Sequence, residues 1–321
     1  AGTAGDTQIY VLQGEQEGGS CLILGGTHAN ELGGHMGAVL FVENAKVEAG
    51  TLYVIPRTNN SAFTHNDPQE GHPSTVHITT DEGNVREFIH GSRATNPVDQ
   101  WPDPDVYVNY MGQSLSGSEN RNINRTYPGK ADGTLTEMMS YGIVQLINTE
   151  NIDVTVDLHE ASPEYPVINA LIAHERAMNL ASNVVVDMQM EGVQISLEPS
   201  PTDLRGLTHR ELGDHTDTLA LLMEAPNPAQ GRLRDRTDEA LVLTGKSETY
   251  VKAGEIGQLY VPYDENGWPI EVRCARHVFG IERILANYSE MYEEPIIVTG
   301  MPSYDELVKN GMGPYLNEPT T

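Results

Sequence analysis

Residues 20–32 decide the fold, and they read Ser20-Cys21-Leu22-Ile23-Leu24-Gly25-Gly26-Thr27-His28-Ala29-Asn30-Glu31-Leu32. The apolar run 20–24 is stopped by two glycines, which is typical of a buried strand that ends in a tight turn. Apolar residues then recur at near-helical spacing from 30 to 44, and a second apolar run, 52–55, ends at Pro56. A strand, a turn, a helix and a strand within about 35 residues predict a βαβ unit with parallel strands.

The rest of the chain continues this alternation, apart from one long irregular segment. Residues 57–133 are rich in Asn, Asp, Pro and Gly, and we expect an insertion of several short elements there that forms part of a cleft. The regular patterns that follow are a capping box at Thr134 and Glu137 opening a helix to about 148, strands at 152–158, 166–173 and 218–223, and helices at 174–191 and 276–292. We therefore predict a single doubly wound α/β domain over 1–321, with a mixed, mainly parallel sheet flanked by helices and a C-terminal segment, 230–321, packed on it.

Composition excludes several functions. The 321 residues carry 46 acidic and 19 basic side chains, a formal charge of −27, which would repel nucleic acid and anionic membranes. No apolar run approaches the length of a transmembrane helix.

Residues 1–5 lack the basic and apolar regions of a signal peptide, which slightly favours the cytoplasm, although a secreted mature chain could start in the same way. The two cysteines do not imply a disulfide, and Cys21 is expected to be buried.

The first candidates for chemistry are His28 and Glu31. They are three residues apart, between a strand end and a helix start, so both side chains can face one point. His159 also lies at a strand end, and two imidazoles with one carboxylate are a common ligand set for a catalytic zinc ion. Asp157 either holds an imidazole in one tautomer or is an ordinary polar residue at a strand end. Glu160 could compete as a ligand, but on a continuing strand it should point away from His159.

Two further groups of polar residues could act on a substrate. Glu224 ends the apolar strand 218–223, where a carboxylate is costly without a partner or a role. Beside zinc it could take a proton from water, and otherwise it would cap the next loop. The loop 120–129 reads Asn-Arg-Asn-Ile-Asn-Arg-Thr-Tyr-Pro-Gly, and its planar donors suit a carboxylate, although a plain surface loop explains them equally well.

Four motifs in this order resemble the zinc carboxypeptidase superfamily: Gly-Gly-Thr-His-Ala-Asn-Glu, Asn-Ile-Asn-Arg-Thr-Tyr-Pro-Gly, Asp-Leu-His-Glu and the strand-end Glu224. Within it, the sequence is most similar to the succinylglutamate desuccinylase/aspartoacylase branch and its carboxypeptidase-like relatives, over roughly residues 20–290. The resemblance implies a zinc carboxypeptidase-like fold and one zinc ion per chain, bound by His28, Glu31 and His159. It also implies that Glu224 acts first as general base and then as general acid.

The resemblance implies a set of substrate-binding residues as well. Asn124 and Arg125 match the Asn-Arg pair that binds a substrate's carboxylate. Arg93 is the preferred match for the arginine that polarises the scissile carbonyl, and Arg121 is the second choice. Arg121 and Arg125 together could form a basic patch for an anionic substrate. For the tyrosine that the family uses near the substrate, the candidates are Tyr250 and Tyr260, or the replacements Arg205 and His209.

These residues predict a zinc-dependent hydrolase that cleaves an amide bond next to a carboxylate-bearing group. The small anionic substrate would be an N-acyl amino acid or a peptide with a free C-terminus, so both a deacylase and a carboxypeptidase remain open. The modest strand content of residues 230–275 favours the carboxypeptidase-like architecture, because deacylases of this group often carry a sizeable C-terminal β domain. The alternative is a non-catalytic zinc-containing module that binds carboxylate ends, in which Glu224 would have no use.

Overall fold

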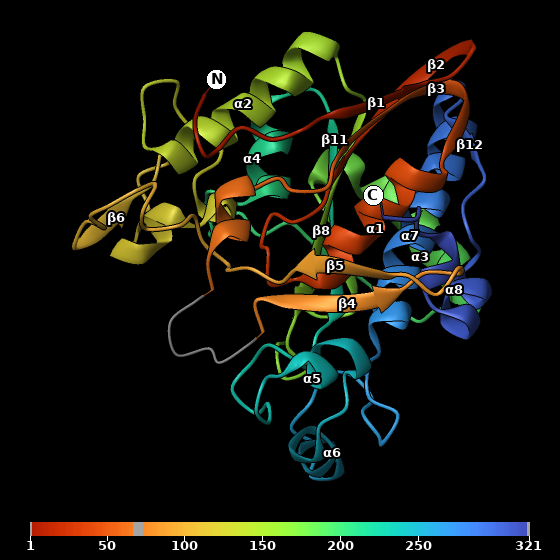
Figure 1. The fold of residues 1–321 in the computed structure, drawn as a ribbon. Coiled ribbons are helices and arrows are strands. Elements are labelled where there is room, and N and C mark those ends of the chain that lie inside the picture. The colour runs from red at the N-terminus through yellow and green to blue at the C-terminus, as the bar shows by residue number, and fades with distance from the viewer. Residues whose placement is uncertain (1, 67–72, 320–321) are drawn as a thin grey trace.

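One mixed β-sheet organises the chain, in a computed structural model that describes residues 2–66 and 73–319 (Figure 1). The strand order is β1-β3-β2-β8-β11-β9-β10, and β12 pairs with β3. The central pairs β2–β3, β2–β8 and β8–β11 are parallel, which confirms the mixed, mainly parallel sheet that the sequence predicts. The strands are β1 (Tyr10–Gln13), β2 (Gln16–Leu24), β3 (Lys46–Ile55), β8 (Val154–Ala161), β9 (Ala170–Ala173), β10 (Ser196–Pro199), β11 (Leu219–Pro226) and β12 (Ile297–Thr299).

Helices cover both sides of this sheet, as a doubly wound fold requires. In Figure 1, α2 and α4 lie on one side of the central strands, and α1, α3 and α7 lie on the other. The helices are α1 (Leu32–Asn44), α2 (Leu135–Glu150), α3 (Met178–Met190), α4 (Thr208–His215), α5 (Glu239–Thr244), α6 (Glu248–Glu255), α7 (Ile270–Tyr292) and α8 (Tyr304–Asn310).

The predicted βαβ unit is β2, α1 and β3, and its two strands are parallel. The predicted capping box of α2 is present as well, since the side chains of Thr134 and Glu137 each bond the other residue's backbone N–H. Several boundaries differ from the prediction, and the strands β2 and β3 begin at Gln16 and Lys46 rather than at 20 and 52. The helix α7 begins at Ile270, directly after Pro269, and so starts earlier than position 276. The strand β9 begins at Ala170 rather than 166, because Asn169 has a positive φ of 55° that an extended strand does not allow.

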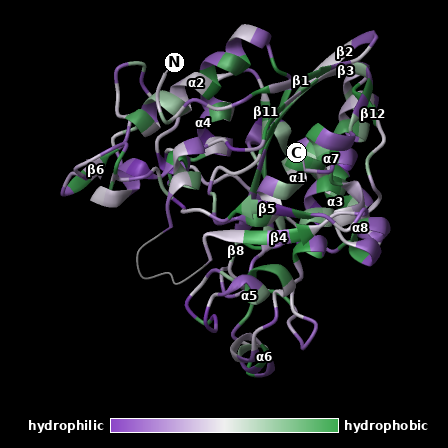
Figure 2. Cartoon of the chain, viewed as in Figure 1, coloured by the Kyte–Doolittle hydropathy of each residue, from purple (hydrophilic) through white to green (hydrophobic). Residues whose placement is uncertain are grey.

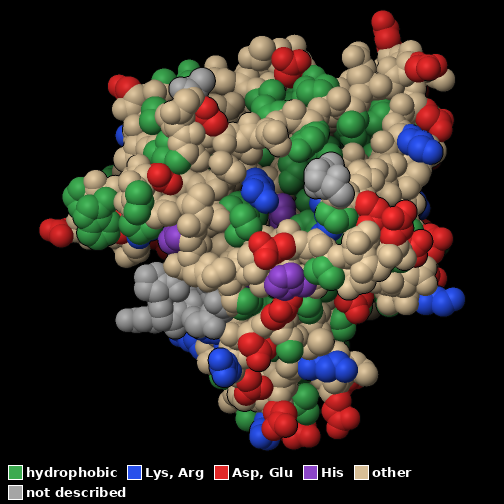
Figure 3. All heavy atoms as spheres, in the orientation of Figure 1, with side chains coloured by type: hydrophobic (Ala, Val, Ile, Leu, Met, Phe, Trp, Pro, Cys, Tyr) green, Lys and Arg blue, Asp and Glu red, His purple; other side chains and the backbone are tan. Residues whose placement is uncertain are grey.

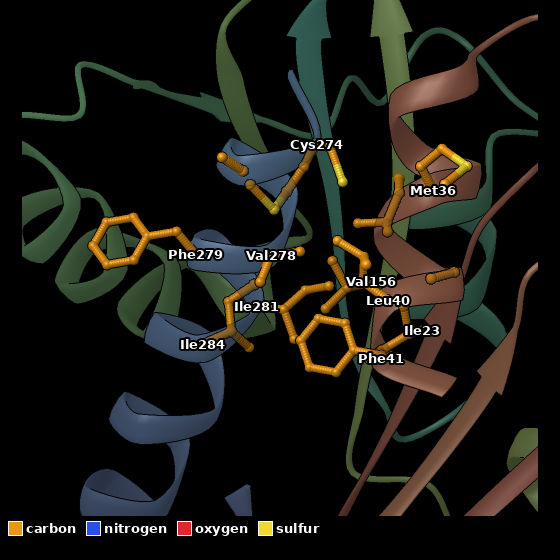
Figure 4. Close-up of a cluster of buried hydrophobic side chains, with 14 of the residues drawn as sticks. Ile23, Met36, Leu40, Phe41, Val156, Cys274, Val278, Phe279, Ile281 and Ile284 are labelled. Carbon is orange, nitrogen blue, oxygen red and sulfur yellow. The ribbon is translucent and has the colours of Figure 1, made fainter. Parts of the chain in front are cut away.

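The two faces of the sheet have different neighbours because side chains alternate along each strand. On one face, β2 and β8 contribute Ile23 and Val156 to a large apolar cluster beneath α1 and α7 (Figure 4). Figure 4 shows Leu40 and Phe41 of α1 facing the side chains of α7 across this cluster. Figure 2 shows the corresponding concentration of hydrophobic residues along the central strands, α1 and α7. Cys21 also belongs to this cluster, so its predicted burial is confirmed.

The segment 57–133 is built from short elements, as the sequence predicts. Its described parts hold two small hairpins, β4–β5 and β6–β7, and three short 3₁₀ helices. These elements are η1 (Asn60–Thr64), β4 (Thr75–Thr79), β5 (Val85–Ile89), β6 (Val106–Val108), β7 (Ser114–Ser116), η2 (Gly117–Arg121) and η3 (Ile123–Arg125). The loop before β6 carries Arg93, and η3 carries Asn124 and Arg125.

None of the helices in the described ranges is long and apolar enough to cross a membrane.

Candidate active site

The sheet register determines which polar side chains can meet. On β8, Val156 and Leu158 face the large apolar cluster, so Asp157 and His159 project from the opposite face. Glu224 of β11 lies directly beside His159 in the parallel register. Neighbouring strands are about 4.8 Å apart, so these two side chains emerge next to each other at the carboxyl ends of their strands.

The first turn of α1 brings Glu31 to the same point. Gly34 allows this approach, because a Cβ atom at that position would lie 2.3 Å from the carbonyl oxygen of Leu158 on β8. Glu31 precedes α1 directly and receives a hydrogen bond of 3.0 Å from the backbone N–H of Glu160. Close packing of a helix on a strand therefore places a carboxylate from one motif against the strand end that holds His159.

His28, Glu31 and His159 converge as the sequence predicts. Their ligand atoms all lie within 4.8 Å of one another, and the three residues are buried. The two oxygens of Glu31 face the two rings: Oε1 is 2.6 Å from Nδ1 of His28, and Oε2 is 2.9 Å from Nδ1 of His159. The group has the residue types and the spacing that could hold one metal ion.

The outer nitrogens of the two rings are held by neighbouring acceptors. Nε2 of His28 donates to Oδ1 of Asn122 at 2.9 Å, and Nε2 of His159 donates to Oδ2 of Asp157 at 2.8 Å. Asp157 is itself held by the hydroxyl of Thr27, at 2.6 Å. In a neutral ring, a proton fixed on Nε2 leaves the lone pair on Nδ1, so both lone pairs are directed at the shared centre. The residues present therefore fit a divalent metal ion.

The charges of this centre also favour a cation. Burial disfavours the charged ring of His159, but Asp157 and Glu31 outweigh it and raise the pKa of this residue well above its usual value. Burial would also keep Glu31 neutral, yet His28 and His159 hold its pKa well below the usual range. The carboxylates of Asp157 and Glu31 thus flank a single positive charge, that of His159, and a bound divalent cation would neutralise both.

Glu224 is partly buried, and one oxygen of its carboxylate is buried without a partner among the described residues. Its Oε2 atom has no hydrogen-bond partner within the described part of the chain. Burial raises the pKa of Glu224 to about 8, against the opposing charges of His159 and Arg93. Such a group holds a proton readily, and a cation nearby would help it to release that proton.

A cavity of about 370 Å³ opens over this centre. Arg93, Asn124 and Arg125 line it together with the three candidate ligands and Glu224. Nη1 of Arg93 lies 3.4 Å from Oε1 of Glu31. Burial and then the charge of Arg93 lower the pKa of Arg125, so the two guanidinium groups lie close enough to influence each other. The segment 57–133 therefore contributes basic and amide groups to the rim of the cavity.

The structure places Arg121 outside this cavity, contrary to its predicted part in a basic patch. Its guanidinium binds Asp103 through two hydrogen bonds of 2.7 and 2.9 Å and also donates to the carbonyl of Thr95. Arg121 therefore holds the loop together, and the basic pair that lines the cavity is Arg93 with Arg125.

Glu160 is engaged elsewhere, which supports its exclusion from the ligand set. Its Oε1 accepts a hydrogen bond of 2.8 Å from Arg273, and both side chains are fully buried. Its Oε2 accepts bonds from Asn227 and from the backbone N–H of Gly33. Every oxygen of this carboxylate thus has a protein partner, in contrast to Glu224.

Among the four residues considered for the tyrosine role, only His209 lines the cavity. The hydroxyl of Tyr250 is bound to Glu164 at 2.7 Å, and Tyr260 is 64% exposed. Arg205 pairs with Glu211. The tyrosine that lines the cavity is Tyr165, which was not among the predicted candidates. Its position four residues after the end of β8 could have indicated it, since loops at that edge of the sheet face the site.

Comparisons with known proteins identify the fold. No family model matches the sequence, and neither does any curated protein. Among solved structures, the product-bound cell shape determinant protein Csd4 from Helicobacter pylori matches with a TM-score of 0.53 and 13% identity, over 94% of this chain and 59% of that one. A succinylglutamate desuccinylase from a Silicibacter species matches with a TM-score of 0.50 and 15% identity, over 92% of this chain and 63% of that one.

These likenesses show that the chain has the carboxypeptidase-like α/β fold that the sequence resemblance predicts. A third match, with a TM-score of 0.50 and 12% identity, is the mDAP-bound form of Csd4, a D,L-carboxypeptidase, over 94% of this chain and 59% of that one. The chain thus spans about three fifths of the length of the structures it matches.

Proposed function

We propose that this protein is a zinc-dependent hydrolase that cleaves an amide bond next to a free carboxylate, as a carboxypeptidase does. The observation that carries the proposal is the buried, unpartnered carboxylate oxygen Oε2 of Glu224 beside the centre formed by His28, Glu31 and His159. A protein that only binds carboxylate ends would have no use for such a group, because burying it without a partner costs free energy.

The proposed chemistry divides between the ion and the side chains. Bound zinc would lower the pKa of a water molecule and polarise a carbonyl oxygen. Glu224 accepts the proton of the attacking water and later donates it to the leaving amine. Its pKa of about 8 in the metal-free protein suits a group that must both take and return a proton near neutral pH.

The side chains at the rim would orient the substrate. Arg125 is the candidate for binding its carboxylate, because a guanidinium can form two parallel hydrogen bonds with that group. Arg93 is nearer the centre and is the candidate for polarising the scissile carbonyl. Asn124 is fixed in place, since its Oδ1 accepts hydrogen bonds from the backbone N–H and the hydroxyl of Thr208.

A substrate panel tests the proposal. The zinc-loaded protein is incubated with N-blocked dipeptides, N-acetylaspartate and N-succinylglutamate, and the released amine is measured. We expect cleavage of the dipeptides that depends on zinc and is lost in Glu224→Gln. Preferential cleavage of the two N-acyl amino acids would instead make the protein a deacylase, and zinc binding without turnover on any substrate would contradict the proposed activity.

A further inference from the structure

The cavity holds one acidic side chain to which the proposed reaction assigns no role. Glu198 lies on β10, two strands beyond Glu224, and lines the cavity. Within the described residues its carboxylate forms no ion pair or hydrogen bond, and the side chain is half-buried. The carboxylate therefore presents a negative charge to an occupant of the cavity, and no protein group in the described ranges neutralises it.

The sheet register places Glu198 at a defined distance from the reacting centre. Glu198 pairs with Ile172, Ile172 with Leu222, and Leu222 with Asp157. Residues paired across neighbouring strands project from the same face, so these four side chains form one row on the cavity side of the sheet. Three strand spacings separate the Cα atoms of Asp157 and Glu198 by about 14 Å.

Asp157 and Glu198 are the polar ends of this row, and the apolar Leu222 and Ile172 lie between them. Leu222 and Ile172 both line the cavity, and Leu204 and Leu207 add further apolar surface. The two arginines of the cavity, Arg93 and Arg125, come from the segment that covers the metal centre. An occupant would therefore meet positive groups near the reacting bond, then hydrocarbon, and then a negative charge.

We infer that Glu198 selects substrates whose carboxylate-bearing residue has a long aliphatic side chain ending in a cationic nitrogen. This inference rests on the proposed function, since it names the residue that follows the scissile bond. The aliphatic part packs on Leu222 and Ile172, while the cationic end forms a charge-assisted hydrogen bond with Glu198. Residues such as lysine, ornithine or another diamino acid fit this arrangement. A side-chain carboxylate would instead face Glu198 with like charge.

The charge of the whole protein acts in the same direction. The formal charge is −27, and Figure 3 shows Asp and Glu side chains spread over the visible face. Such a field attracts cationic substrates and repels dicarboxylates. A basic side chain would thus offset the repulsion that the substrate's own carboxylate experiences on approach.

Paired substrates test this inference. The ratio of kcat/KM for N-blocked dipeptides ending in lysine and in norleucine is measured for the wild type, Glu198→Gln and Glu198→Lys. We expect the wild type to prefer lysine by about tenfold or more, Glu198→Gln to lose that preference, and Glu198→Lys to prefer a C-terminal glutamate instead. Glu290→Gln, which removes an exposed carboxylate at the end of α7, is the matched control and should keep the wild-type ratio.

Binding separates this inference from the proposed reaction. The affinities of free lysine and free norleucine are measured by calorimetry on the zinc-loaded wild type and on Glu198→Gln. Tighter binding of lysine that depends on Glu198 supports the inference even if no dipeptide is cleaved, in which case only the proposed function fails. Equal affinities, no binding of either amino acid, or a lysine preference that survives in Glu198→Gln would overturn it.

Discussion

The two faces of the central sheet are built from the same strands but serve different purposes. On β8, Val156 and Leu158 pack into the large apolar cluster, whereas Asp157 and His159 enter the candidate site. The apolar face is buried by the side chains of α1, α3 and α7, which pack directly on it. The opposite face has its own apolar cluster, in which Leu22 and Leu24 of β2 pack beneath α2, and its polar residues at the strand ends depend on contacts from distant segments, such as Asn122 against His28. Substitutions on the two faces should therefore affect different properties.

The largest effect is expected at the polar strand ends, from His159→Ala. This variant removes one of the three proposed ligands and leaves Glu31 and Asp157 facing each other without the imidazole between them. We expect loss of bound zinc after dialysis and of all measurable hydrolysis, with elemental analysis and the dipeptide assay as readouts. His77→Ala alters an exposed ring on β4 and is the control. Full zinc occupancy in His159→Ala would remove this residue from the ligand set.

Glu224→Gln should leave the metal in place and reduce turnover. The amide has nearly the same shape but cannot accept the proton, so we expect kcat to fall by roughly 10²–10⁴-fold. Zinc content should match that of the wild type. If the variant kept wild-type turnover, the proton transfer assigned to Glu224 would be wrong.

Glu160, the glutamate that is paired with Arg273, should behave differently from Glu224. Arg273→Met removes the partner of Glu160 and leaves a fully buried carboxylate without its counter-ion. We expect the free energy of unfolding to decrease by about 3–5 kcal/mol, measured by urea titration. The double variant Glu160→Gln/Arg273→Met should recover part of this loss, because no uncompensated charge remains. A double variant less stable than Arg273→Met alone would contradict this explanation.

A substitution on the apolar face should reduce stability without a direct effect on the site. Leu40 of α1 is fully buried and packs within the large apolar cluster, so Leu40→Ala leaves a cavity. We expect a loss of about 2–5 kcal/mol in the free energy of unfolding, with unchanged zinc stoichiometry. Val186→Ala on the exposed side of α3 is the control and should change stability little. Loss of zinc from folded Leu40→Ala would show that the two faces are more strongly coupled than this comparison suggests.

The parts of the site that could be predicted from sequence lie at strand ends. His159 and Glu224 lie near the ends of apolar strands, and His28 and Glu31 lie between the end of β2 and the start of α1. Parallel strands bring such positions to one edge of the sheet. The central strands, the capping box of α2 and the βαβ unit were predictable because local patterns determine them.

The remaining parts depend on contacts between distant segments. Arg121 lies in the motif that suggested carboxylate binding, but the partner that removes it from the cavity, Asp103, is in another loop. Asn122 accepts a hydrogen bond from His28, which lies 94 residues away in the chain. Glu198 lies on a strand of four residues that is too short to show a pattern, and its place in the cavity follows from the pairing of β10 with β9.

The proposed metal centre is tested most directly by a crystal structure of the zinc-loaded protein with anomalous data collected at the zinc absorption edge. We expect one strong peak per chain, in contact with Nδ1 of His28, Nδ1 of His159 and a carboxylate oxygen of Glu31, with Glu224 nearby but outside the ligand set. A peak bound by other residues, or zinc held directly by Glu224, would contradict the proposed centre.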